Sequence, residues 1–184
     1  VSAGQTATIT GVGTLTIGVD GSYTFTPALN YHGAVPSATY TLSDGSLSTT
    51  STLAIAITSV NDAPVGVADT VTTNEDTSAS GNVLSNDTDV DGDTLSVTQF
   101  VWGSSTTLAG GTATITGVGT LTIGVNGSYT FTPALNYHGA VPSATYTLSD
   151  GSLSTTSTLA LAITSVNDAP VGVADTVTTN EDTS

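Results

Sequence analysis

The segment Thr112–Thr132 reads TATITGVGTLTIGVNGSYTFT, and it decides the fold class. Apolar residues alternate with threonine or alanine in three short runs: Thr112–Thr116, Thr120–Ile123 and Tyr129–Thr132. A period of two places the threonines on one face and the apolar side chains on the other, which is typical of half-buried antiparallel strands. Gly117-Val118-Gly119 and Asn126-Gly127 separate the runs and favour tight turns. The segment therefore predicts antiparallel strands joined by turns.

The same pattern continues on both sides of this segment. Further strands are expected at Val71–Thr73, Asn82–Leu84, Leu95–Phe100, Ala144–Leu148 and Thr158–Thr164. No stretch has the periodicity of a helix, so about seven or eight short strands fill about 100 residues. This pattern predicts an all-β chain built from immunoglobulin-like antiparallel β-sandwiches.

An internal repeat organises the chain. Ala7–Val19 recurs letter for letter at Ala113–Val125, an offset of 106 residues, and residues 1–78 differ from residues 107–184 at only five positions. The sequence Asn-Asp-Ala-Pro occurs at Asn61–Pro64 and again at Asn167–Pro170, where proline favours an extended linker. We therefore expect the C-terminal part of one repeat at 1–62, a complete repeat at 63–168 and the N-terminal strand region of the next at 169–184. Each repeat is long enough to bury its own core, so the units are linked end to end.

The charge of the chain is entirely negative. Its 184 residues include 15 acidic side chains and neither lysine nor arginine, which gives a net charge of −15. No carboxylate can pair with a basic side chain, so cations are the expected partners. Nucleic acids and anionic membrane surfaces are excluded, because nothing here could neutralise a phosphate. No apolar run reaches the roughly 18 residues that a bilayer-spanning helix needs.

The acidic residues are clustered. Asp87, Asp89, Asp91 and Asp93 alternate along one loop that also contains Gly92, so their oxygens can converge on one hard cation. Without a cation, carboxylates this close repel one another. The loop lacks the terminal glutamate and the flanking helices of an EF-hand, so that motif is rejected and Ca²⁺ is kept as the expected ion.

These motifs together resemble the cadherin repeat. The resemblance rests on Asn61-Asp62-Ala63-Pro64, Glu75, Thr88-Asp89-Val90-Asp91, Ser149-Asp150-Gly151 and Val166-Asn167-Asp168-Ala169-Pro170. The phrases Gly127–Asn136 and Asn86–Leu95 are typical of the bacterial cadherin-like and VCBS-type tandem repeats of giant secreted RTX adhesins.

The resemblance implies calcium at each junction between repeats. At the first junction it implies linker ligands Asn61 and Asp62 and ligands Asp89, Asp91 and Asp150 from the following repeat; at the second, Glu75 with Asn167 and Asp168. We add Asp76 beside Glu75, and Asp87 and Asp93, which could hold an ion within the loop. This chain departs from the cadherin pattern because no acid lies between Thr94 and Ser149, so we expect fewer ions per junction.

Three other features are interpreted as structural. His32 and His138 follow a tyrosine in a turn and have no ligand partners near in sequence. Trp102, the only tryptophan, is expected in the core, although it could be a sugar-stacking platform. Acids duplicated in near-identical repeats argue against catalytic carboxylates, so we do not expect an enzyme.

The expected function is a calcium-stiffened extender of a large extracellular bacterial adhesin or biofilm matrix protein, secreted or held at the cell surface. Its expected partners are neighbouring repeats of the same chain. Two alternatives stay open: a repeated weak carbohydrate- or protein-binding module, and a subunit of a self-assembling extracellular filament that contacts other copies by strand addition.

Overall fold

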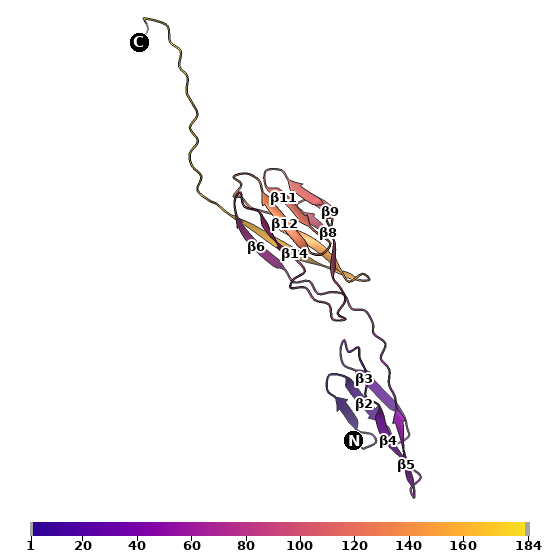
Figure 1. Cartoon of the computed structure of the whole chain (residues 1–184). Coiled ribbons are helices and arrows are strands. Elements are labelled where there is room, and N and C mark those ends of the chain that lie inside the picture. Colours follow the sequence, from indigo (N-terminus) through magenta and orange to yellow (C-terminus); the bar gives the residue numbers. More distant parts are fainter. Residues whose placement is uncertain (1, 183–184) are drawn as a thin grey trace.

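The computed structural model describes residues 2–182, and this part of the chain is all-β, as predicted. Two β-rich units follow one another in line, joined by a short linker, and an extended segment continues beyond the second unit (Figure 1). No helix among residues 2–182 is long and apolar enough to cross a membrane.

The second unit is a sandwich of two sheets, whose strands lie between Asp69 and Thr164. One sheet has the order β10-β11-β12-β7, and the other has the order β6-β14-β13-β8-β9. The strands are β6 (Asp69–Asn74), β7 (Ala79–Asn82), β8 (Ser96–Trp102), β9 (Ser105–Leu108), β10 (Thr112–Ile115), β11 (Gly119–Ile123), β12 (Ser128–Pro133), β13 (Ala144–Ser149) and β14 (Ser154–Thr164). Neighbours pair antiparallel except β6 and β14, which run parallel.

The core lies between the two sheets and consists of the apolar side chains that alternate with threonine. Phe131 and Tyr146 are fully buried, on β12 and β13 respectively. Trp102 is also fully buried; its ring meets that of Phe131 edge-on at 5.8 Å, and its Nε1–H donates to the carbonyl of Pro142 at 2.8 Å. Trp102 is therefore a core residue, as expected, and is not available as a platform for sugars.

Two details differ from the strand prediction. The strand expected at Asn82–Leu84 is β7, and it lies earlier, because Ala79–Asn82 pairs with β12 while Val83 packs into the core just past its end. Strand β9 was not predicted, since Ser105–Leu108 has a single strongly apolar residue. It forms because β8 offers it a free edge, with Phe100 opposite Thr107.

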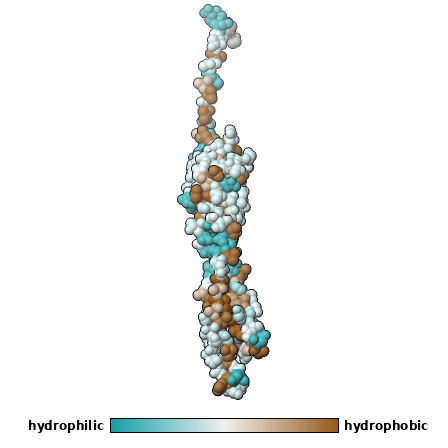
Figure 2. Space-filling view, turned by 90° about the vertical axis from the view of Figure 1, so that its right-hand side faces the viewer, coloured by the Kyte–Doolittle hydropathy of each residue, from teal (hydrophilic) through white to brown (hydrophobic). Residues whose placement is uncertain are grey.

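Residues 2–62 form a smaller set of sheets. They contain β1 (Thr6–Ile9), β2 (Gly13–Ile17) and β3 (Tyr23–Pro27) in one sheet and β4 (Ala38–Ser43) with β5 (Ser48–Leu53) in the other. Apolar side chains are exposed here: Leu42 is 49% exposed, whereas its counterpart Leu148 is fully buried. The strands equivalent to β6–β9 are not among residues 2–62, so the inner faces lack their cover. Figure 2 shows the resulting hydrophobic patch on this unit.

Residues 169–182 have the same sequence as residues 63–76, yet no strand is assigned among them. In the complete repeat the corresponding residues become β6 by pairing with β14. Strand formation in this segment thus depends on a neighbouring edge, and its sequence alone does not produce a strand.

Candidate metal-binding junction

The linker between the two units is held by side chains at the end of the complete repeat where the chain enters it. Asn61 donates from Nδ2 to the Asp150 carboxylate at 2.8 Å. The backbone N–H of Asp62 donates to Oδ2 of Asp91, also at 2.8 Å, and the Ser59 hydroxyl lies 3.4 Å from the other Asp91 oxygen. The structure therefore brings linker residues Asn61 and Asp62 together with Asp91 and Asp150 of the following repeat, as the resemblance implied.

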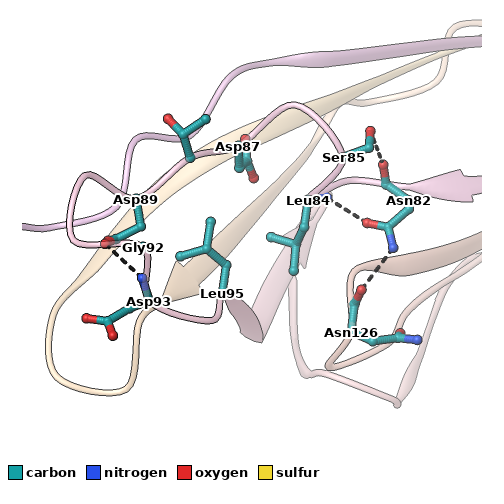
Figure 3. Close-up of a pocket in the computed structure, with 10 residues that line it drawn as sticks. Asn82, Leu84, Ser85, Asp87, Asp89, Gly92, Asp93, Leu95 and Asn126 are labelled. Atoms are coloured by element: carbon teal, nitrogen blue, oxygen red, sulfur yellow. Dashed lines mark hydrogen bonds between the residues drawn. The ribbon is translucent and has the colours of Figure 1, made fainter.

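The acidic loop is shaped by Asp89. Its Oδ1 accepts the backbone N–H groups of Asp91 at 2.9 Å and Asp93 at 3.3 Å, and Gly92 has a φ of +80°, a conformation that glycine adopts without strain. Figure 3 shows Asp89 and Asp93 on the loop, with the bond from Asp93 to Asp89 drawn. The other oxygen, Oδ2 of Asp89, is buried and has no hydrogen-bond partner among the described residues. Burying a carboxylate oxygen without a hydrogen-bond donor costs free energy of folding. This oxygen would therefore be stabilised by a positively charged partner.

Asp150 sits in the turn between β13 and β14. Its Oδ1 accepts the backbone N–H groups of Ser152 and Leu153, at 2.6 and 2.7 Å. The Asn61 side chain, followed by these two backbone donors, holds the pKa of Asp150 below its ordinary value. The carboxylate is thus ionised at neutral pH and faces the linker.

Asp87 and Asp93 occupy different positions in the loop. Asp87 points inward: its Oδ1 accepts the N–H of Val67 at 2.7 Å, and its Oδ2 lies 3.0 Å from the Tyr146 hydroxyl. Asp93 is exposed. Both border an open hollow beside the loop that also touches Asp89 and has Leu84 and Leu95 in its lining (Figure 3). An ion within this loop stays a prediction.

The second junction contains Glu75, which is 5% exposed. Its Oε1 accepts the backbone N–H of Val166 and the hydroxyl of Ser165, and its Oε2 lies 3.4 Å from Nδ1 of His138. The Val166 N–H is the largest cause of a lowered pKa for Glu75.

The other expected ligands at this end make different contacts. Asp76 accepts the backbone N–H of Asn136 at 2.8 Å, the Asn167 amide lies 3.3 Å from the carbonyl of Asp168, and the Asp168 side chain is exposed. Asp76 follows Glu75 directly, whereas Asn167 and Asp168 lie in the linker after β14. Among the described residues these side chains form no metal-binding group.

No group of three or more histidine, aspartate or glutamate side chains within residues 2–182 is close enough together to hold a metal ion. At the first junction, Asp91 and Asp150 accept hydrogen bonds from different donors of the linker, the Asp62 N–H and the Asn61 amide. The eleven-residue ligand set inferred from sequence is thus divided between the two ends of the repeat, and metal binding by these residues stays a prediction.

The histidines lie at the junctions, which the sequence did not indicate. Nδ1 of His32 is 3.6 Å from Oδ1 of Asp91 in the following repeat, whereas Nδ1 of His138 is 3.4 Å from Oε2 of Glu75 in its own repeat. The sequence does contain a signal for a role of this histidine, because it recurs with the 106-residue offset. Its position beside the linker, however, depends on how the sandwich folds.

Comparisons with known proteins identify the class. The model of the bacterial cadherin-like domain matches residues 61–165, and that of the cadherin-like domain matches residues 2–58. The chain therefore belongs to the bacterial cadherin-like domain family. Domains of this family are extracellular, are in general not enzymes and typically bind Ca²⁺, which suggests a repeat of the adhesion or extender type.

Similarity to individual proteins is distant. No curated protein matches. Among solved structures, an endo-fucoidan hydrolase of glycoside hydrolase family 107 is 16% identical over 88% of this chain and 23% of its own, with a TM-score of 0.36. A chimeric titin Z1Z2 carrying a peptide from decorin is 16% identical over 85% of this chain and 74% of its own, with a TM-score of 0.33. The chain thus spans about a quarter of the hydrolase, and these likenesses carry no functional argument.

Proposed function

We propose that the chain is part of the calcium-stiffened stalk of a large secreted bacterial adhesin or biofilm matrix protein. The observation that carries the proposal is the buried, unpartnered Oδ2 of Asp89, next to a linker already fastened to Asp91 and Asp150. A cation is the partner this oxygen lacks, since the chain contains no lysine or arginine to supply one.

The donor set fits calcium. Asp89, Asp91 and Asp150 of one repeat, with Asn61 and Asp62 of the linker, offer only hard oxygen ligands, which Ca²⁺ prefers. Asn61 donates its amide N–H to Asp150; its amide oxygen would be the group that binds an ion. Calcium would supply the positive charge that pairs with these carboxylates. At the other end, Glu75, Asn167 and Asp168 would do the same for the next junction.

A bound ion would matter most for the angle between repeats. Interfaces between domains along one chain are small, so relative motion is the default without an additional link. Three linker hydrogen bonds hold this junction, from Ser59, Asn61 and Asp62. An ion shared by the linker and the following repeat would fix that angle. The family resemblance to RTX adhesins adds secretion into calcium-rich surroundings, where weak sites of about 10⁻⁴–10⁻³ M are still filled.

Small-angle scattering tests this proposal. A chain of several complete 106-residue repeats should be extended in millimolar Ca²⁺, with a maximum dimension that grows linearly with repeat number. In EDTA the carboxylates repel and the linkers should sample bent shapes. The matched control carries Asp89→Asn and Asp91→Asn in every repeat and should not respond to Ca²⁺. A maximum dimension that ignores Ca²⁺ in the unmodified chain would overturn the proposal.

A further inference from the structure

We propose that a serine and a histidine, at the end of each repeat where the chain leaves it, form a carboxylate socket that an aspartate of the following repeat can occupy. The socket is Ser59 with His32 in the first unit and Ser165 with His138 in the complete repeat, pairs that the 106-residue offset relates. It is formed by protein groups without an ion. Its use at the joints of a stalk rests on the proposed function.

In the complete repeat the socket holds a glutamate of the same repeat. The Ser165 hydroxyl donates to Oε1 of Glu75 at 3.1 Å, and Nδ1 of His138 lies 3.4 Å from Oε2. The backbone N–H of Val166 also donates to Oε1. The Glu75 side chain is only 3% exposed, so the carboxylate is enclosed among these donors. Both of its oxygens are thus bound by the end of its own repeat.

In the first unit the equivalent side chains face a carboxylate of the next repeat. The Ser59 hydroxyl donates to Oδ1 of Asp91 at 3.4 Å, and Nδ1 of His32 lies 3.6 Å from the same oxygen. The Asp62 N–H donates to Oδ2 at 2.8 Å. The Asp91 side chain is 10% exposed and enters a pocket that is otherwise lined by the first unit and the linker. Equivalent sockets therefore hold acids from two different places in the chain.

The histidine is a hydrogen-bond donor in this arrangement. Nδ1 of His32 also lies 3.3 Å from the carbonyl oxygen of Asn30, which can only accept. We assign the ring hydrogen to Nδ1, because this nitrogen faces a carbonyl and a carboxylate and no donor. Hydrogen bonds to a carboxylate are charge-assisted and stronger than bonds between neutral groups. The socket therefore favours a carboxylate over a neutral amide or hydroxyl.

Only one acid at a time can use these donors fully. The serine hydroxyl and the Nδ1–H group have one hydrogen each, and two carboxylates side by side repel. Residues 2–62 contain no glutamate, so Asp91 meets no competitor of that kind at Ser59 and His32. In an array of complete repeats, Glu75 and the counterpart of Asp91 in the next repeat compete for one socket. The contacts of Glu75 with serine and histidine are the shorter ones, so glutamate is the preferred occupant and leaves the joint free to bend.

Pulsed electron paramagnetic resonance in EDTA tests the contact across the first joint of the 184-residue chain. The chain has no cysteine, so spin labels at Thr50→Cys and Thr106→Cys, both exposed, report the distance between the units. His32→Phe and Ser59→Ala each remove a donor and should broaden the distance distribution, whereas His32→Asn keeps a nitrogen donor and should restore much of the narrow one. Ser165→Ala is the matched control and should leave the distribution unchanged. A distribution that ignores both donor removals, or that broadens equally with the control, would overturn the proposal.

The competition is tested on a chain extended through one further complete repeat, labelled at Thr106→Cys and at its counterpart in the added repeat. Glu75→Ala empties the socket for the next repeat, so the distance distribution across the second joint should become narrower. Glu75→Gln, which keeps an oxygen and loses the charge, should narrow it less. Ser165→Ala added to Glu75→Ala should abolish the narrowing, and the fluorescence of Trp102 checks that each variant is folded. A second joint that is unchanged or broader in Glu75→Ala would show that the two acids do not share a socket. Because all these measurements are made in EDTA, failure of the calcium proposal does not affect them.

Discussion

Asn61 in the linker donates a 2.8 Å hydrogen bond to Asp150, which lies 89 residues later in the chain. The contact joins the end of one repeat to the far turn of the next, because that turn between β13 and β14 returns to the end where the chain enters. Two segments that are distant in sequence, the linker and the turn between β13 and β14, thus each supply one residue to the junction. Its hydrogen bond is also the largest cause of the lowered pKa of Asp150.

The Asp150 carboxylate should make the stability of the chain depend on pH in EDTA. Its folded-state pKa lies below the ordinary 3.8, so the ionised group contributes stability above that value. The contribution is lost as pH falls through the folded pKa. Asp150→Asn should therefore be less stable than the parent chain at pH 7, by a small amount because the carboxylate is solvated. The difference should vanish in strong acid. Urea unfolding followed by the fluorescence of Trp102 measures it, and a difference that grows in acid would contradict the assignment.

Calcium should raise the melting temperature of the chain. An ion that binds only the folded state stabilises it by RT ln(1 + [L]/Kd), about 2.7 kcal/mol when the ion is at 100 times its Kd. Calorimetric melts in millimolar Ca²⁺ and in EDTA measure the shift. Asp89→Asn combined with Asp91→Asn should remove most of it, because these substitutions neutralise the carboxylate with the unpartnered oxygen and the one that contacts Asp62.

The strand content of that double variant should stay close to that of the parent, because the loop lies at the end of the sandwich and outside the core cluster. Circular dichroism checks this. Identical melting temperatures in Ca²⁺ and EDTA for the parent chain would count against calcium binding.

Much of the fold could be predicted because most strands of the sandwich have a regular alternation of threonine with apolar residues. Alternation of threonine with apolar residues indicates β10, β11 and β12, and Gly117-Val118-Gly119 and Asn126-Gly127 indicate the turns between them. Strand β9 and the start of β7 could not be predicted from this pattern. Ser105–Leu108 and Ala79–Asn82 contain few apolar residues and become strands only by pairing with a neighbour. The parallel pairing of β6 with β14 is likewise a property of topology and is not written in either strand.

The candidate site divides in the same way. The spacing of Asp89 and Asp91 and their likeness to the cadherin motif predicted a metal-binding loop at the junction; Asp91 contacts the linker there, and metal binding by the loop stays a prediction. The contact of Asp87 with Tyr146, 59 residues apart, could not be read from sequence, because it depends on β13 passing behind the loop. His32 was likewise assigned to a turn, and its place beside Asp91 emerges only when two repeats are set in line.

Tyr146→Phe should destabilise the complete repeat by about 1–2 kcal/mol. The ring remains in the core, so no cavity forms, but the hydroxyl leaves the carbonyl of Val83, at 2.9 Å, and the carboxylates of Asp69 and Asp87. Equilibrium urea unfolding of the variant and of Tyr137→Phe, which removes a hydroxyl bonded at 2.6 Å to the Ala140 carbonyl, isolates the effect. Equal losses for the two variants would show that the buried hydroxyl has no special role.

Asp69→Asn should stabilise the complete repeat at neutral pH. Burial raises the pKa of Asp69, which means that its charged form is disfavoured in the folded state, and the nearby Asp87 carboxylate raises the pKa further. Both carboxylates approach the hydroxyl of Tyr146, which has one hydrogen and can donate to only one of them. An asparagine keeps an oxygen for that hydroxyl and removes the like charge.

The pH dependence distinguishes this explanation from a packing effect. With a raised folded-state pKa, the cost of ionised Asp69 is present at high pH and disappears as pH falls below the unfolded value of about 3.8. The advantage of Asp69→Asn in EDTA should therefore be largest at pH 7 and absent near pH 3. Asp69→Ala, which also removes the repulsion but leaves Tyr146 without that acceptor, should gain less. Urea unfolding at both pH values measures these differences, and an asparagine variant that is less stable than the parent at pH 7 would show that the Asp69 charge is favourable where it lies.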